Sequence, residues 1–241
     1  MVASEKVVWV TGASSGIGKS LTKQFYANNI SILATARNIE KLKELESQLK
    51  AKFPTSNSNL IVAKCNVTNL SEIDSLFDNI VDVSKISCLI NNAGITSFKK
   101  INDNSIDEVN SIIQTNLIGS IYTIKKILPS LISKNEGMII NILSVVTKKV
   151  FLNSGIYTAS KLGLMGFLNV LREEVRRNNI RIVNVIPGAT ETSIWSSDML
   201  NKYSDRMMKP DDIAKIIVDY FMNQSSPVIE EIVLRPIGGD L

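Results

Sequence analysis

Short hydrophobic runs, often β-branched, alternate along the chain with longer stretches in which apolar residues recur every three or four positions. The short runs predict strands: KVVWVTG, SILATAR, LIVAKCNV, SCLINNAG, MIINILS, RIVNVIPG and EEIVLRP. Helical patterns lie near residues 16–29, 38–52, 69–83, 105–133, 154–179 and 210–223. Nearly continuous hydrophobic strands separated by helices are typical of a parallel sheet covered on both faces. We therefore predict an α/β fold with a doubly wound, seven-stranded parallel sheet.

The chain has 241 residues, 44% of them hydrophobic, and no Pro- or Ser-rich linker divides it. We expect one domain over residues 1–241, since a single α/β domain of this size buries about 70–75% of its unfolded surface. Cys65 and Cys88 lie in apolar runs, which favours buried free thiols over a disulfide. With no histidine in the chain, we expect no metal site.

The formal net charge is +4. The lysines are scattered rather than gathered in a stripe with aromatic residues, which argues against nucleic-acid binding. The opening segment MVASEKVVWV lacks the long apolar core of a signal peptide. The apolar stretch 112–132 contains Lys125, Lys126 and Pro129, so it predicts a packed helix rather than a membrane span. We expect a cytoplasmic protein without a membrane partner.

The first predicted strand ends in TGASSGIGKS, which places Gly12, Gly16 and Gly18 where a strand turns into a helix. Glycines permit a tight turn and let backbone N–H groups approach a pyrophosphate, and the helix N-terminus adds positive potential. Glycines also end strands for conformational reasons alone. Their position at the first strand–helix boundary favours dinucleotide binding by a Rossmann-type domain.

The second predicted strand ends in ATARN, with Ala36 and Arg37 where an NAD-binding protein normally carries an acid for the ribose hydroxyls. The charge and forked donors of arginine suit a 2′-phosphate instead. Ser14 and Asn38 can add neutral donors. The alternative is that Arg37 is simply a solvated charge at a strand end. We predict NADP(H) as the cofactor.

Tyr157 and Lys161 stand four residues apart in IYTASK, so a helix places them on one face. An ammonium beside a phenol lowers the phenol pKa from about 10, which offers proton transfer in a chain without histidine. Such a pair alone is a weak signal, because Tyr and Lys on one face usually just pack at the surface. Ser144, upstream in INILS, strengthens it.

Together these motifs resemble the short-chain dehydrogenase/reductase family, in particular its compact single-domain oxidoreductases. The resemblance covers essentially the whole chain. It rests on the three glycines, NNAG at 91–94, Asn116 in TNLIG, Ser144, the Tyr157–Lys161 pair and PGATET from Pro187.

The resemblance implies a catalytic tetrad. Tyr157 would protonate the carbonyl oxygen as hydride arrives, or act as the base in the reverse direction, and Lys161 would lower its pKa and hold the nicotinamide ribose. Ser144 would hydrogen-bond the substrate oxygen. Asn116 would help to retain a water in the proton relay. Taken singly, Ser144 is also compatible with a strand-end hydroxyl, and Asn116 with a helix residue that bonds backbone.

The resemblance also implies a cofactor site built from several strand ends. Its residues are Gly12, Ser14, Ser15, Gly16, Ile17, Gly18, Arg37, Asn38, Asn66, Val67, Asn91, Ala93, Gly94, Tyr157, Lys161, Pro187, Gly188, Thr190 and Thr192. Two positions depart from the family. Asn66 replaces a common aspartate, although its amide oxygen can still accept from the adenine amino group. Leu143 stands where serine is common.

The segment from about Thr190 to Lys209 follows a strand end and would line the substrate crevice. An apolar pocket is suggested by Ile194, Trp195, Met199, Leu200, Met207 and Met208, together with Val145, Val146 and Phe151. These residues could instead pack the loop onto the core or a partner subunit. An apolar ketone, a β-ketoacyl thioester and a sugar-derived ketone all remain open. A basic patch of Lys99, Lys100, Lys148 and Lys149 would suit an acidic carrier protein.

We therefore predict NADPH-dependent reduction of a small-molecule ketone to an alcohol. One alternative is a 3-oxoacyl-carrier-protein reductase of fatty-acid synthesis, and another is a non-catalytic NADP(H)-binding regulator. The intact tetrad favours an enzyme, since a sensor needs the glycine turn but not the acid. The helices at 105–133 and 154–179 carry more Ile and Leu than a sheet-facing stripe requires, so we expect a homodimer or homotetramer.

Overall fold

The computed structural model describes residues 6–223 and 227–241, so the first five residues of the MVASEKVVWV segment lie outside the described part. Seven strands form one sheet in the order β3-β2-β1-β4-β5-β6-β7, and every neighbouring pair is parallel. The strands are β1 (Val7–Thr11), β2 (Ser31–Ala36), β3 (Leu60–Lys64), β4 (Ile86–Asn91), β5 (Gly137–Ile142), β6 (Ile180–Pro187) and β7 (Glu231–Leu234). The predicted doubly wound sheet is confirmed, and its order reverses between β1 and β4.

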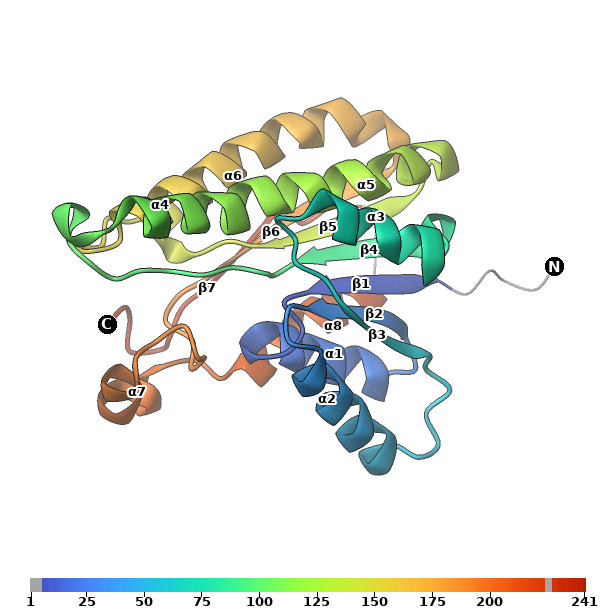
Figure 1. Ribbon diagram of the computed structural model, residues 1–241, viewed down its shortest axis with the longest axis horizontal. Coiled ribbons are helices and arrows are strands. Elements are labelled where there is room, and N and C mark those ends of the chain that lie inside the picture. The colour runs from blue at the N-terminus through green and yellow to red at the C-terminus, as the bar shows by residue number, and fades with distance from the viewer. Residues whose placement is uncertain (1–5, 224–226) are drawn as a thin grey trace.

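Helices cover both faces of the sheet (Figure 1). One face carries α1 (Gly16–Ala27), α2 (Ile39–Lys52) and α8 (Pro210–Met222). The other carries α3 (Leu70–Asn79), α4 (Ile106–Ile113), α5 (Gly119–Lys134) and α6 (Gly155–Val175). The short helix α7 (Ser197–Tyr203) stands apart from both layers, at the end of the sheet where the chain also ends.

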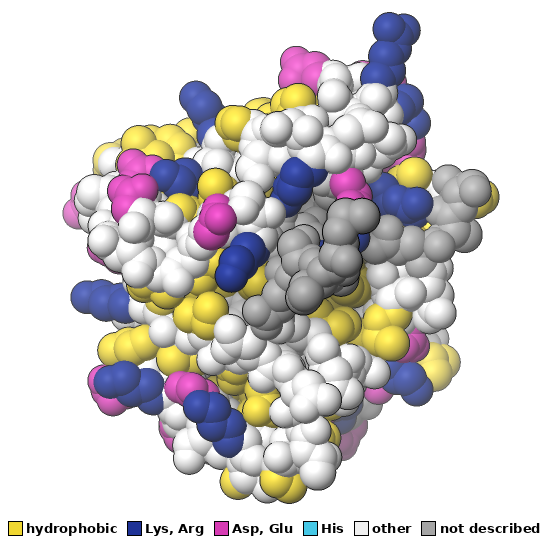
Figure 2. All heavy atoms as spheres, turned by 90° about the vertical axis from the view of Figure 1, so that its right-hand side faces the viewer, with side chains coloured by type: hydrophobic (Ala, Val, Ile, Leu, Met, Phe, Trp, Pro, Cys, Tyr) yellow, Lys and Arg dark blue, Asp and Glu magenta, His cyan; other side chains and the backbone are white. Residues whose placement is uncertain are grey.

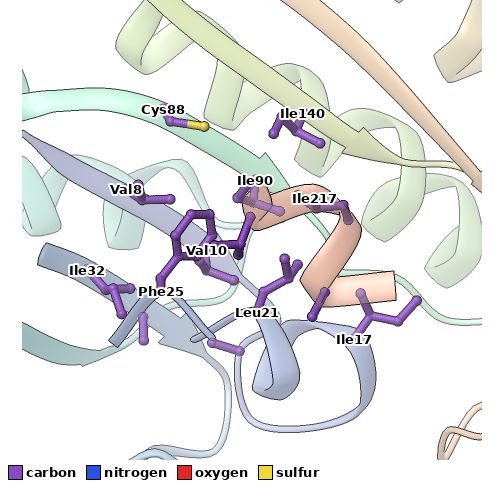
Figure 3. Packing of buried hydrophobic residues seen from close by; sticks show 14 of the residues in the cluster. Val8, Val10, Ile17, Leu21, Phe25, Ile32, Cys88, Ile90, Ile140 and Ile217 are labelled. Carbon is purple, nitrogen blue, oxygen red and sulfur yellow. The ribbon is translucent and has the colours of Figure 1, made fainter. Parts of the chain in front are cut away.

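The hydrophobic core lies in two layers because successive strand residues point to opposite faces. In β1, Val8 and Val10 pack with Phe25 of α1 in one layer, and Ile217 of α8 closes it (Figure 3). Trp9, between the two valines, packs in the other layer with α3, α5 and α6. Both layers are apolar, which explains why the strands read as continuous hydrophobic runs.

Two segments differ from the sequence prediction. The helix predicted over 105–133 starts with a capping box at Ser105 and Glu108, but a π-helical turn (Gln114–Ile118) separates α4 from α5. Helix α7 lies within the segment that was predicted only as a substrate loop. Cys65 and Cys88 are buried free thiols, as predicted, and burial raises the pKa of Cys65 to about 12.

Figure 2 shows the side of the molecule at which β1 begins. Lysine and arginine side chains are interspersed there with aspartate and glutamate. Within residues 6–223 and 227–241, no helix is both long and apolar enough to cross a lipid bilayer.

Candidate active site

A cavity of about 1280 Å³ opens at the carboxyl ends of the strands. Ligand pockets typically measure about 300–1,000 Å³, so this one has room for a dinucleotide and a substrate together. Of the predicted site residues, its wall includes Gly12, Ser14, Ser15, Gly16, Ile17, Arg37, Asn38, Asn66, Val67, Ala93, Gly94, Ser144, Tyr157, Lys161, Pro187, Gly188, Thr190 and Thr192. Gly18, Asn91 and Asn116 lie behind the wall and support it.

The glycine turn needs glycine for two different reasons. Gly12 and Gly16 have φ of 65° and 51°, a left-handed conformation that disfavours other residues. Gly18 is required by space, because a Cβ there would lie 2.4 Å from the Gly12 carbonyl oxygen and 2.4 Å from Asn92 Nδ2. Ser15, the N-cap residue of α1, makes no side-chain cap bond. The first turn of α1 therefore keeps N–H groups for an anion.

The end of β2 brings cations to the cavity. Arg37 and Asn38 are exposed and line it, and Asn38 also caps α2 by accepting from the Lys41 N–H at 3.0 Å. Lys41, in the first turn of α2, lines the cavity too. Lys41 could not be predicted as a site residue, because a lysine in the first turn of an amphipathic helix carries no functional signal by itself.

The NNAG segment links the glycine turn to the neighbouring strand. Thr11 Oγ1 accepts from the N–H groups of Asn92 and Ala93 at 3.0 and 3.1 Å, and Asn92 Nδ2 donates to the Thr11 carbonyl at 2.9 Å. Asn91 is buried and bonds Asn141 Oδ1, its register partner on β5, at 3.2 Å. Asn91 therefore fixes the strand ends instead of lining the cavity.

Asn66 does not have the free acceptor that was expected of it. Its amide oxygen already accepts from the Thr68 N–H at 3.2 Å and from the Thr68 hydroxyl at 3.1 Å. An amide oxygen has two lone pairs. The predicted bond from the adenine amino group would therefore have to displace one of these two bonds, and Asn66 does line the cavity.

Asn116 lies in the π-helical turn, where the side chains do not follow the spacing of a regular α-helix. The side chain is fully buried and bonds both backbone groups of Ile95, accepting from the N–H and donating to the carbonyl at 2.8 Å each. Nδ2 also donates to Ser160 Oγ at 3.0 Å, and Ser160 lies between Tyr157 and Lys161 on α6. Asn116 thus ties the loop after β4 to the helix that carries the predicted acid.

Ser144, Tyr157 and Lys161 converge on one side of the cavity. Ser144 follows β5, and its hydroxyl lies near enough to the buried Tyr157 hydroxyl to favour the charged form of the phenol. Lys161 Nζ lies 5.8 Å from the centre of the Tyr157 ring, on the same helix face as predicted. This ammonium is also buried, and it donates to the Ile142 carbonyl at 2.7 Å.

Burial dominates the ionisation of both groups. It raises the pKa of Tyr157 to about 12, and the nearby Ser144 hydroxyl, which favours the phenolate, only partly opposes this. Burial also lowers the pKa of Lys161 to about 8. The expectation that Lys161 lowers the Tyr157 pKa below its ordinary value is therefore wrong for this structure. At neutral pH, Tyr157 is a protonated phenol and Lys161 is mostly charged.

The cavity wall also carries apolar side chains, set among polar and charged ones such as Lys99, Glu108 and Arg206. Of the residues predicted for an apolar pocket, the wall includes Val145, Val146, Phe151, Ile194, Trp195 and Met199. Met207 and Met208 instead pack inward: Met207 is buried and Met208 contacts the core layer of α1 and α8. An isolated β-bridge between Thr190 and Met208 joins the two ends of the segment 190–209.

The fold and the cavity define a dinucleotide-dependent oxidoreductase, and comparison with known proteins agrees. The sequence profile of the family described as short chain dehydrogenase matches residues 6–202. This protein belongs to that family, and it is an oxidoreductase. A relative named sepiapterin reductase, from Chlorobaculum tepidum, is 30% identical over 98% of both chains. An uncharacterized oxidoreductase of Staphylococcus aureus is 30% identical over 98% of this chain and 99% of its own.

Solved structures share the fold over nearly the whole chain. A metagenomic short-chain oxidoreductase in complex with NADP is 27% identical, with a TM-score of 0.82 over 97% of both chains. The closed form of serine dehydrogenase with NADP⁺ is 24% identical, with a TM-score of 0.88 over 98% of this chain and 96% of that one. The cofactor in the first of these structures agrees with the NADP(H) predicted from Arg37.

Proposed function

We propose that this protein reduces the carbonyl of a small, mainly apolar ketone to an alcohol at the expense of NADPH. The observation that carries the proposal is the grouping of Tyr157, Ser144 and Lys161 on the wall of the cavity that the glycine turn also lines. The cavity fits a dinucleotide with a 2′-phosphate. Gly12 and Gly16 of the glycine turn line this cavity, and so do the cations Arg37 and Lys41.

Bound NADPH would supply hydride to the carbonyl carbon. Tyr157 Oη would donate its proton to the carbonyl oxygen, and its pKa of about 12 keeps that proton available at neutral pH. Ser144 Oγ would hydrogen-bond the same oxygen while negative charge develops there. The Lys161 ammonium would stabilise the phenolate that remains, and Asn116 would hold α6 in position through Ser160.

Two alternatives receive less support. A carrier-protein substrate would need a free basic patch, but three of its four lysines are in ion pairs: Lys99 with Glu108, Lys148 with Glu231 at 2.7 Å, and Lys149 with Asp240 at 3.3 Å. A non-catalytic regulator would not need Tyr157, Ser144 and Lys161 together on the wall of the cofactor cavity.

The test is oxidation of NADPH, followed at the nicotinamide absorbance, with a panel of aliphatic ketones, aryl ketones and β-ketoacyl thioesters. Sepiapterin belongs in the panel because a relative 30% identical to this chain is named for its reduction. We expect turnover of at least one apolar ketone and none of carrier-bound thioesters. Tight NADPH binding without turnover of any substrate would instead support the regulator.

A further inference from the structure

Two aromatic side chains from separate loops stack on each other at the substrate end of the cavity. Phe98 lies in the loop after β4, and Trp195 lies just before α7. Their ring centres are 4.7 Å apart and their planes differ by 10°. Phe98 also meets the ring of Tyr157 edge-on, with centres 6.4 Å apart at 66°. An aromatic wall therefore runs from the predicted proton donor to the segment 190–209.

This wall is fixed relative to the cofactor turn. The indole Nε1 of Trp195 donates to the Thr190 carbonyl at 3.0 Å, and the Trp195 N–H donates to the Thr192 carbonyl at 3.2 Å. Thr192 in turn packs against Gly16, so closely that a Cβ on that glycine would lie 3.0 Å from its methyl carbon. Two hydrogen bonds and one close packing contact thus connect the indole to the glycine turn.

The wall has unused aromatic surface. Phe98 is 41% exposed although its ring lines the cavity together with Trp195. Exposure of this much phenyl surface in a concave site is unfavourable in water and favours an apolar partner. The stacked rings leave no room for a third ring between them, so a partner must meet the outer surface of the pair.

We propose that Phe98 and Trp195 select ketones in which the carbonyl is attached to a planar aromatic or heteroaromatic ring. The inference rests on the proposed carbonyl reduction, and it adds the substrate class. The ring would lie along the wall while its carbonyl reaches Ser144 and Tyr157. Ring–ring contacts contribute beyond the area that they bury, because the edge and face of a π system carry opposite partial charges. A saturated ring of equal size lacks this contribution.

The experiment compares two ketones with the same carbon skeleton, acetophenone and cyclohexyl methyl ketone, in the wild type and in Phe98→Leu and Trp195→Leu. The ratio of kcat/KM for the two ketones cancels general effects of a variant. Each substitution should lower the acetophenone preference about two- to thirteen-fold, the factor expected for one aromatic contact. Phe77→Leu is the matched control, because Phe77 packs edge-on against Trp9 in the core. It should leave the ratio unchanged.

A second readout does not require turnover. The chain has two tryptophans, so Trp9→Phe leaves Trp195 as the only reporter. In the NADP⁺ complex of that variant, acetophenone should quench Trp195 saturably, and cyclohexyl methyl ketone should compete more weakly. Selective quenching without any ketone turnover would support the wall and reject the proposed reaction. Ketone turnover with unchanged ratios in both leucine variants would overturn the wall and leave the reaction standing.

Discussion

The charge on Lys161 should set the upper pH limit of the proposed reduction. Burial lowers the pKa of Lys161 to about 8, from 10.5. The ammonium is the protonated form, so it is present below that pH and lost above it. About nine-tenths of the molecules carry the charge at pH 7 and about one-tenth at pH 9. Tyr157, with a pKa of about 12, stays protonated throughout this range.

The pH dependence of kcat/KM, measured at limiting NADPH and ketone, reports the ionisations of the free enzyme, which are those described above. It should be level to about pH 7 and then fall about fivefold between pH 8 and pH 9. Lys161→Arg keeps its charge above pH 12, so its rate should stay level to pH 10 even if it is lower overall. Circular dichroism at each pH separates this effect from unfolding. A level wild-type profile to pH 10, or the same fall in Lys161→Arg, would refute the reasoning.

Three further outcomes are expected. Gly18→Ala should lower the unfolding free energy by about 1–3 kcal/mol and abolish the thermal stabilisation by NADPH, because the added Cβ would lie 2.4 Å from the Gly12 carbonyl oxygen. The control Gly166→Ala adds a Cβ in open space, so it should change neither the unfolding free energy nor the stabilisation by NADPH. Arg37→Ala should raise the KM for NADPH about 10- to 150-fold and leave that for NADH unchanged; equal losses would make Arg37 structural. Light scattering of the wild type should give a mass that is a multiple of the 26.6 kDa chain. Val170→Glu should lower that mass, because Val170 is 61% exposed on α6, where a second copy would pack. The monomer mass for the wild type would contradict this prediction.

The elements that the sequence predicted best are those whose signal is local. Continuous hydrophobic runs such as Val7–Thr11 are required of strands buried on both faces. Gly12 and Gly16 are visible because their backbone conformation admits few other residues. The Tyr157–Lys161 pair is also a local signal, because residues four apart on any helix share a face.

The features that escaped prediction depend on distant partners. The π-helical turn at Asn116 leaves the apolar period nearly intact, so no pattern marks it. The elevated pKa of Tyr157 follows from burial, which depends on how the loops pack over α6. The stack of Phe98 on Trp195 joins segments far apart in the sequence, and neither residue stands in a recognisable motif.

The most direct test of the proposed chemistry is Tyr157→Phe, which keeps the ring beside Phe98 and removes only the hydroxyl. NADPH affinity, measured by fluorescence titration, should stay within about twofold of the wild type, because the ring and Lys161 remain in place. The kcat for a ketone that the wild type reduces should fall by about 10²–10⁴, the usual contribution of general acid catalysis. Retention of more than about a tenth of the wild-type kcat would contradict the assignment of Tyr157 as the proton donor.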